Sequence, residues 1–190
     1  MTGKLLQQAK SGVRARFWFT GISPVDFMDT RRLGTLEIRS AKDFAALFEA
    51  GKIGPEPWPK PRSGLWWRER LSGLRSPIKT ALMRQDRVAG LGNIAASEIC
   101  WRAGLPPERP ASDLAAQCWE RLGAAALAHI EMALEDLDQA PLRYLAEGGG
   151  NPFFVYGREG EYCRRCKEVI LRSRQAGRST FYCSGCQTSR

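Results

Sequence analysis

The sequence contains no long apolar run and is poor in acidic residues and histidine. No stretch approaches the roughly 20 consecutive apolar residues of a membrane-spanning helix, so no membrane association is expected. Its 20 Asp and Glu oppose 29 Lys and Arg, which gives a formal net charge of +9. A chain this basic favours a nucleic acid or another anionic surface as partner. The single histidine, His129, falls in a helical pattern and is interpreted as a core or surface residue, not a ligand.

The chain also lacks a signal-peptide pattern, an internal repeat and any low-complexity tract. Its composition, 43% hydrophobic and 26% charged over 190 residues, predicts one or two compact domains. Cys100 and Cys118 lie in helical patterns, as do Trp66, Trp67, Trp101 and Trp119. We interpret all six as core residues.

Local patterns predict a small β region followed by a helical one. Alternation of polar and apolar residues predicts strands at 12–19 and 36–38, and Ser40 is expected to cap a helix at 40–49. Gly and Pro mark 51–61 as a linker. Helical spacing then extends from 64 to about 145, with a stop at 104–107, Ser112 as the cap of a long helix, and a last short helix from Pro141.

Four cysteines near the C-terminus form two pairs, Cys163 with Cys166 and Cys183 with Cys186, separated by sixteen residues. Two Cys-x-x-Cys knuckles at this distance are typical of a zinc ribbon with four thiolate ligands. The alternative, two disulfides in a secreted fragment, is disfavoured because no signal-peptide pattern precedes them. With all positions taken by thiolates, one structural Zn²⁺ is expected, on two short strands joined by a turn at Gly177 with a positive φ.

The segment between the outer cysteines is strongly basic. It holds six cations and a single acid, Glu168. A solvated basic face is the simpler interpretation, but this excess in so small a module favours a polyanion. The six are Arg164, Arg165, Lys167, Arg172, Arg174 and Arg178.

A glycine-rich turn, Gly90-Leu-Gly92-Asn93, lies between two helical patterns. A dinucleotide fingerprint is disfavoured, because that motif follows a strand. In a helix–two-turn–helix, the glycines would allow close approach of a partner, and Asn93 at the N-cap would mark an anion site for a nucleic-acid phosphate. Alternatively, Asn93 only caps its own helix. The turn alone does not separate these two possibilities.

Five patches together resemble the formamidopyrimidine-DNA glycosylase and endonuclease VIII family, on the formamidopyrimidine side. They are Met1-Thr-Gly3, Asp29 to Gly34, Ile78-Lys79, Gly90 to Glu98, and Gly177 to Gln187. The resemblance implies an α+β protein in which residues 1–50 are the remnant of an N-terminal β-sandwich. A linker at 51–63, a helix–two-turn–helix domain at 64–150 and a zinc-ribbon β-hairpin at 151–190 would follow.

The resemblance also implies binding of double-stranded DNA with a damaged or abasic nucleotide. Family members remove oxidised purines and nick the strand by β,δ-elimination. Lys79 and Asn93 match residues that grip the backbone, and Arg178 matches the finger arginine that holds phosphate and is credited with a role in elimination. Met1, Arg31 and Leu33 match the residues that fill the space left by the flipped base. Gly92 and Arg75 complete the expected DNA-binding set.

Departures from the family pattern keep more than one function open. The family's N-terminal proline nucleophile, its glutamate and an early catalytic lysine match no position here; Leu33 stands for the usual phenylalanine and Ala95 for a common tyrosine. One hypothesis is a repair glycosylase and lyase whose sequence is truncated, which would be inactive as given. The others are a non-catalytic DNA-binding protein and a zinc ribbon for RNA or a protein. We expect a cytoplasmic, nucleoid-associated monomer.

Overall fold

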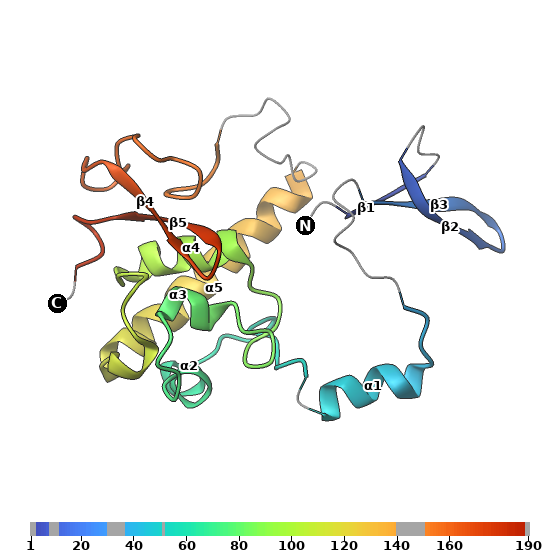
Figure 1. Cartoon of the computed structure of the whole chain (residues 1–190), viewed down its shortest axis with the longest axis horizontal. Helices are drawn as coiled ribbons and strands as arrows, with labels where there is room; N and C mark the ends of the chain where they lie inside the picture. Colours follow the sequence, from blue (N-terminus) through green and yellow to red (C-terminus); the bar gives the residue numbers. More distant parts are fainter. Residues whose placement is uncertain (1–2, 8–11, 30–36, 51, 140–150, 189–190) are drawn as a thin grey trace. The chain divides into compact units, whose positions relative to one another are not determined.

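The computed structural model describes residues 3–7, 12–29, 37–50, 52–139 and 151–188 (Figure 1). The chain divides into two compact units, Met1–Phe44 and Ala45–Arg190, each described by itself below. Among the helices within these ranges, none has both the length and the apolarity that crossing a bilayer requires. The observed elements confirm the predicted α+β class.

The first unit is a three-stranded antiparallel sheet in the order β1-β3-β2. Its strands are β1 (Gly3–Gln7), β2 (Val13–Phe19) and β3 (Ile22–Asp29). Only the strand at β2 was predicted. β3 was not predicted, and it contains Pro24, a residue that is rare in central strands. Pro24 lies beyond the residues that pair with β1, beside an irregularity in the pairing with β2, so its missing N–H removes no regular ladder bond.

An ion pair between an exposed arginine and a buried aspartate connects two strands of this sheet. The Arg16 guanidinium donates to both carboxylate oxygens of fully buried Asp26, with N–O distances of 2.5 and 2.9 Å. The expected strand at 36–38 is wrong in its described part, because Glu37 and Ile38 are coil and Ile38 is 97% exposed. Ser40 does cap α1 (Ala41–Glu49), since its Oγ accepts from the Asp43 N–H at 3.1 Å.

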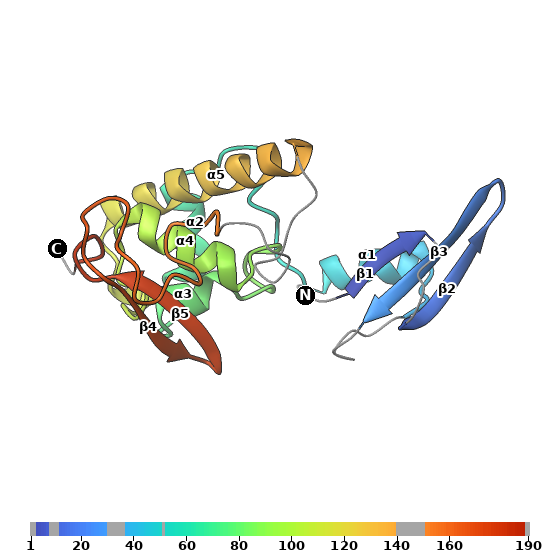
Figure 2. The ribbon, with the colours of Figure 1, turned by 90° about the horizontal axis from the view of Figure 1, so that it is seen from above.

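The second unit is a helical body with a β-hairpin. Its elements are α2 (Gly64–Leu71), α3 (Ile78–Leu82), α4 (Asn93–Ala103), the 3₁₀ turn η1 (Ala111–Asp113), α5 (Ala116–Gln139), β4 (Ile170–Gln175) and β5 (Arg178–Cys183). Helix α4 lies between α5 and the hairpin (Figure 2). The predicted four-part division of the chain stays a prediction.

The helical core confirms most of the apolar residues predicted from the sequence, whereas Trp66 is only partly buried against it. Trp67, Trp119, Cys100 and Cys118 are all buried, together with Leu71, Leu82, Ile99 and Leu122. The start of α2 and the residue segment before it approach α5 at Gly123, where an added Cβ would lie 2.8 Å from the carbonyl oxygen of Arg62 and 3.1 Å from the Trp67 ring. A glycine in mid-helix is therefore explained by close packing of these two segments.

The long helix begins later than predicted. Ser112 does not cap α5; its Oγ bonds the neighbouring Asp113 carboxylate at 2.8 Å inside η1. Leu114 then adopts an extended backbone that interrupts the helical path, so α5 starts at Ala116. The stop predicted at 104–107 is confirmed, because Gly104 ends α4 with a φ of +66°.

Candidate nucleic-acid interface and metal centre

The four cysteines of the two knuckles converge on one point. The Sγ atoms of Cys163, Cys166, Cys183 and Cys186 all lie within 4.8 Å of one another. The Cys163–Cys186 and Cys166–Cys183 sulfur pairs are 3.7 and 3.3 Å apart, and all four thiols are free. A tetrahedral ion with metal–sulfur bonds of about 2.3 Å requires sulfur–sulfur edges of about 3.8 Å. The cluster therefore fits a metal ion.

The hairpin between the knuckles has the predicted form. Strands β4 and β5 pair from Ile170–Cys183 to Gln175–Arg178, which leaves Ala176 and Gly177 as the two-residue turn. Their φ values are +46° and +75°, as a type I′ turn requires. Gly177 was predicted to take this conformation, whereas Ala176 was not. Arg178 follows the turn and is exposed.

Three polar groups from distant segments meet beside Arg178. The Lys79 ammonium donates to Asn93 Oδ1 at 2.5 Å, and the Asn93 amide donates to the Ser179 carbonyl at 3.0 Å. Lys79 Nζ also lies 3.5 Å from that carbonyl. Lys79 comes from α3, Asn93 from the start of α4 and Ser179 from β5. The predicted residues Lys79 and Asn93 therefore lie together, next to the predicted Arg178.

The electrostatics of Lys79 reflect this setting. Its side chain is fully buried, and burial lowers the pKa of Lys79 to about 8. Cys100 opposes this shift, and the positive charge of Arg178 adds to it. A buried lysine held close to an exposed arginine favours an anion nearby.

The expectation that Asn93 caps its helix is wrong. Gly92, with a φ of −102°, is the N-cap of α4, and Asn93 is the first helical residue. Its side chain instead contacts the Lys79 ammonium and the Ser179 carbonyl of β5. Asn93 therefore links two segments, which neither of the two possibilities left open by the sequence included.

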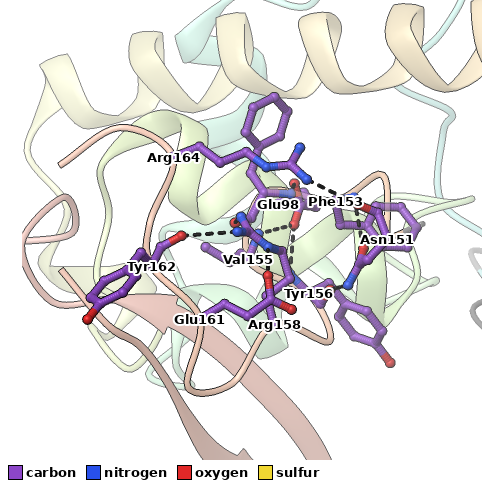
Figure 3. Close-up of polar contacts among 10 residues, drawn as sticks. Glu98, Asn151, Phe153, Val155, Tyr156, Arg158, Glu161, Tyr162 and Arg164 are labelled. Carbon is purple, nitrogen blue, oxygen red and sulfur yellow. Dashed lines mark hydrogen bonds and ion pairs between the residues drawn. The ribbon is translucent and has the colours of Figure 1, made fainter. Parts of the chain in front are cut away.

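A buried carboxylate on α4 attaches residues 154–156, which precede the cysteine-bearing hairpin, to that helix. Glu98 is fully buried and accepts the backbone N–H groups of Phe154, Val155 and Tyr156 at 3.0, 2.9 and 2.9 Å (Figure 3). Asn151 closes the same segment by donating to the Tyr156 carbonyl at 2.8 Å. Sequence reasoning placed Glu98 in a motif but assigned it no role.

The cysteine cluster also packs directly on the helical body. Trp101 of α4 shares an apolar cluster with Cys163, Ile170 and Cys183, and its ring stacks on Phe154. Gln187 bridges both parts: its Oε1 accepts the Cys183 N–H, and its Nε2 donates to the Leu105 carbonyl, both at 2.8 Å.

The other predicted DNA-binding residues are not brought to this cluster by a described contact. Arg75 is exposed between α2 and α3. Met1, Arg31 and Leu33 lie outside the described residues.

Known proteins resemble this chain in sequence and in fold. The sequence model described as formamidopyrimidine-DNA glycosylase H2TH domain matches residues 53–141. A formamidopyrimidine-DNA glycosylase of Desulfitobacterium hafniense is 33% identical over 196 residues, covering 98% of this chain and 72% of the relative. The chain belongs to the formamidopyrimidine-DNA glycosylase family.

Solved structures of the family match this chain along its whole length. Lactococcus lactis Fpg, in a complex with DNA containing an abasic site, superposes with a TM-score of 0.83 at 31% identity. The match covers 100% of this chain and 73% of that one. MutM in complex with DNA containing carbocyclic 8-oxo-G gives a TM-score of 0.83 at 32% identity and is covered to 72%.

Proposed function

We propose that this chain binds duplex DNA at a damaged or abasic nucleotide, as a base-excision repair protein of the formamidopyrimidine-DNA glycosylase type. The observation that carries this is the convergence of Lys79, Asn93 and the strand that begins at Arg178. Two cations and an amide within one small cluster suit a DNA phosphate, which accepts charge-assisted hydrogen bonds. The relatives named above support the choice of damaged DNA.

In this proposal the residues have separate tasks. Arg178 and Lys79 neutralise a phosphate, and Arg178 carries the role in elimination that the resemblance implies. Asn93 orients the Lys79 ammonium and attaches it to β5. Gly92 leaves the backbone accessible before α4, and Arg75 supplies a further backbone contact. Met1, Arg31 and Leu33 would fill the space left by the flipped base.

The metal that fits the cysteine cluster is proposed to be one Zn²⁺. Four thiolates from two knuckles form a closed tetrahedral set, which suits a structural zinc and leaves no position for a reacting water. The ion would hold the hairpin that presents Arg178. Reduced thiols and a genomic DNA partner are consistent with a monomer that works at the nucleoid in the cytoplasm.

The test compares binding of the 190-residue chain to two fluorescein-labelled duplexes, one with a tetrahydrofuran abasic analogue and one undamaged. We expect tighter binding to the first, with affinity that falls steeply as salt rises, because phosphate contacts release counterions. Arg178→Ala should weaken binding and reduce the slope of log K against log salt by about 0.9. The control is Arg121→Ala, which removes the same charge from an exposed position of α5.

Equal affinity for both duplexes, or equal effects of the two arginine variants, would contradict the proposal. Borohydride trapping on a duplex with a true abasic site then separates the glycosylase and lyase from the non-catalytic DNA-binding alternative, because only an enzyme amine bonded to the sugar carbon is trapped.

A further inference from the structure

Glu98 has an unusual environment for a carboxylate. It is fully buried on α4, and no basic side chain pairs with it within the described residues. A buried charge is costly unless its oxygens are satisfied. Here three consecutive backbone N–H groups, those of residues 154–156, provide that stabilisation. The carboxylate thus fixes both the position and the direction of this short segment.

The segment fixed by Glu98 contacts the proposed DNA-binding cluster. The Tyr156 ring packs edge-on against Phe181 of β5, with centroids 5.0 Å apart. The Tyr156 hydroxyl lies 3.5 Å from the Asn93 amide nitrogen. Phe181 is three residues beyond Arg178 on the same strand. A displacement of Tyr156 would therefore reach both Asn93 and the strand that carries Arg178.

In addition to the apolar packing of Trp101, helix α4 consequently has polar attachments to residues 151–188 at two separate positions. Asn93 binds the Ser179 carbonyl at the start of the helix, and Glu98 binds 154–156 more than one turn later. A single attachment would allow the hairpin to rotate about it, whereas each further attachment restricts that rotation. We propose that Glu98 is a positioning residue that aligns Arg178 with the Lys79–Asn93 pair on one DNA phosphate. This inference rests on the proposed function.

The test is Glu98→Gln in the zinc-loaded full chain. Glutamine keeps the volume, but one of its two terminal groups is a donor, so it cannot accept all three N–H groups. Glu131→Gln, at an exposed position of α5, is the matched control because it removes the same charge. Both variants make the protein more basic, which alone strengthens DNA binding slightly. We expect Glu98→Gln to bind the abasic-analogue duplex about tenfold more weakly than Glu131→Gln.

A double-mutant cycle with Arg178→Ala distinguishes positioning from a general loss of structure. If Glu98 acts through Arg178, the tenfold loss should largely disappear in the Arg178→Ala background. Zinc content per chain should stay equal to that of the wild type. A loss of the same size in both backgrounds, or a loss of zinc together with affinity, would show a merely structural role and overturn the proposal.

A second variant covers the case in which Glu98→Gln does not fold. Tyr156→Leu leaves all three Glu98 hydrogen bonds possible, because they use backbone groups, but removes the ring contact with Phe181. It should weaken DNA binding in a way that again depends on Arg178, and an additive effect would count against the inference. Failure of the wild type to bind duplex DNA would refute the proposed function itself. Normal wild-type binding with equal Glu98→Gln and Glu131→Gln affinities would refute only this inference.

Discussion

Lys79 should make the stability of the protein depend on pH in an alkaline range. Burial lowers its pKa from 10.5 to about 8 in the folded state. Below pH 8 the lysine is charged in both states, so the folded protein bears the full cost of the buried charge. Between pH 8 and 10.5 only the unfolded chain keeps the proton, so the free energy of unfolding rises with pH.

The decrease of the Lys79 pKa from 10.5 to about 8 corresponds to a free-energy cost of burying the ammonium of at most roughly 3 kcal/mol. Asn93, which accepts from the Lys79 ammonium, is only half-buried, so solvent reduces the cost of burying this charge. We therefore expect the free energy of unfolding to change by about 1–2 kcal/mol. The measurement is urea unfolding of the zinc-loaded wild type and of Lys79→Met, from pH 7 to 10. The difference in unfolding free energy, wild type minus variant, should increase by that amount.

Comparison with a variant removes the contributions of the other titrating groups, which are common to both proteins. Lys52→Met, at an exposed position, serves as the control and should give a difference that does not change with pH. A flat difference for Lys79→Met as well would refute the claim that burial destabilises this ammonium. The same shift predicts that DNA affinity of the wild type falls by at most tenfold per pH unit above pH 8, because a bound phosphate favours the protonated lysine.

Three further predictions concern the metal, the helix packing and the salt dependence of binding. Cys183→Ser should release the metal and unfold the hairpin. The zinc content per chain and the dispersion of the hairpin amide resonances in NMR spectra measure these two effects. Retention of one zinc per chain would refute binding by four thiolates. Gly123→Ala should lower the free energy of unfolding by about 1–3 kcal/mol, because the new Cβ would lie 2.8 Å from the Arg62 carbonyl oxygen. This cost exceeds the gain from the better helix propensity of alanine. A variant that is more stable in thermal unfolding would contradict the close packing at Gly123. Lys79→Met should reduce the salt slope of DNA binding by about 0.9, and an unchanged slope would exclude a phosphate contact.

Features set by neighbouring residues were predictable from the sequence. The knuckle spacing indicated the cysteine cluster, and Gly177 indicated the turn, because both depend on a few adjacent residues. The buried Trp67, Trp101 and Trp119 followed from helical spacing. The proximity of Lys79, Asn93 and Arg178 came from family resemblance, since no local pattern relates positions so far apart.

Features set by distant partners were not predictable. Asn93 looked like a cap, but its amide serves a carbonyl 86 residues away in the chain. Glu98 binds backbone N–H groups 56 to 58 residues away, and backbone groups leave no signature in side-chain composition. Ser112 resembles an N-cap in the sequence, but the extended backbone of Leu114 separates it from α5. The roles of Met1, Arg31 and Leu33 stay predictions.

Gln187 limits how freely the C-terminal hairpin could be exchanged or grafted. One end of its amide holds the Cys183 N–H inside the second knuckle, and the other end holds the Leu105 carbonyl just after α4. A hairpin transplanted from another protein would keep its own cysteines but lose this bridge unless it brought a glutamine at the same place. The base of the hairpin is therefore constrained by the turn that follows α4 as well as by its own cysteines.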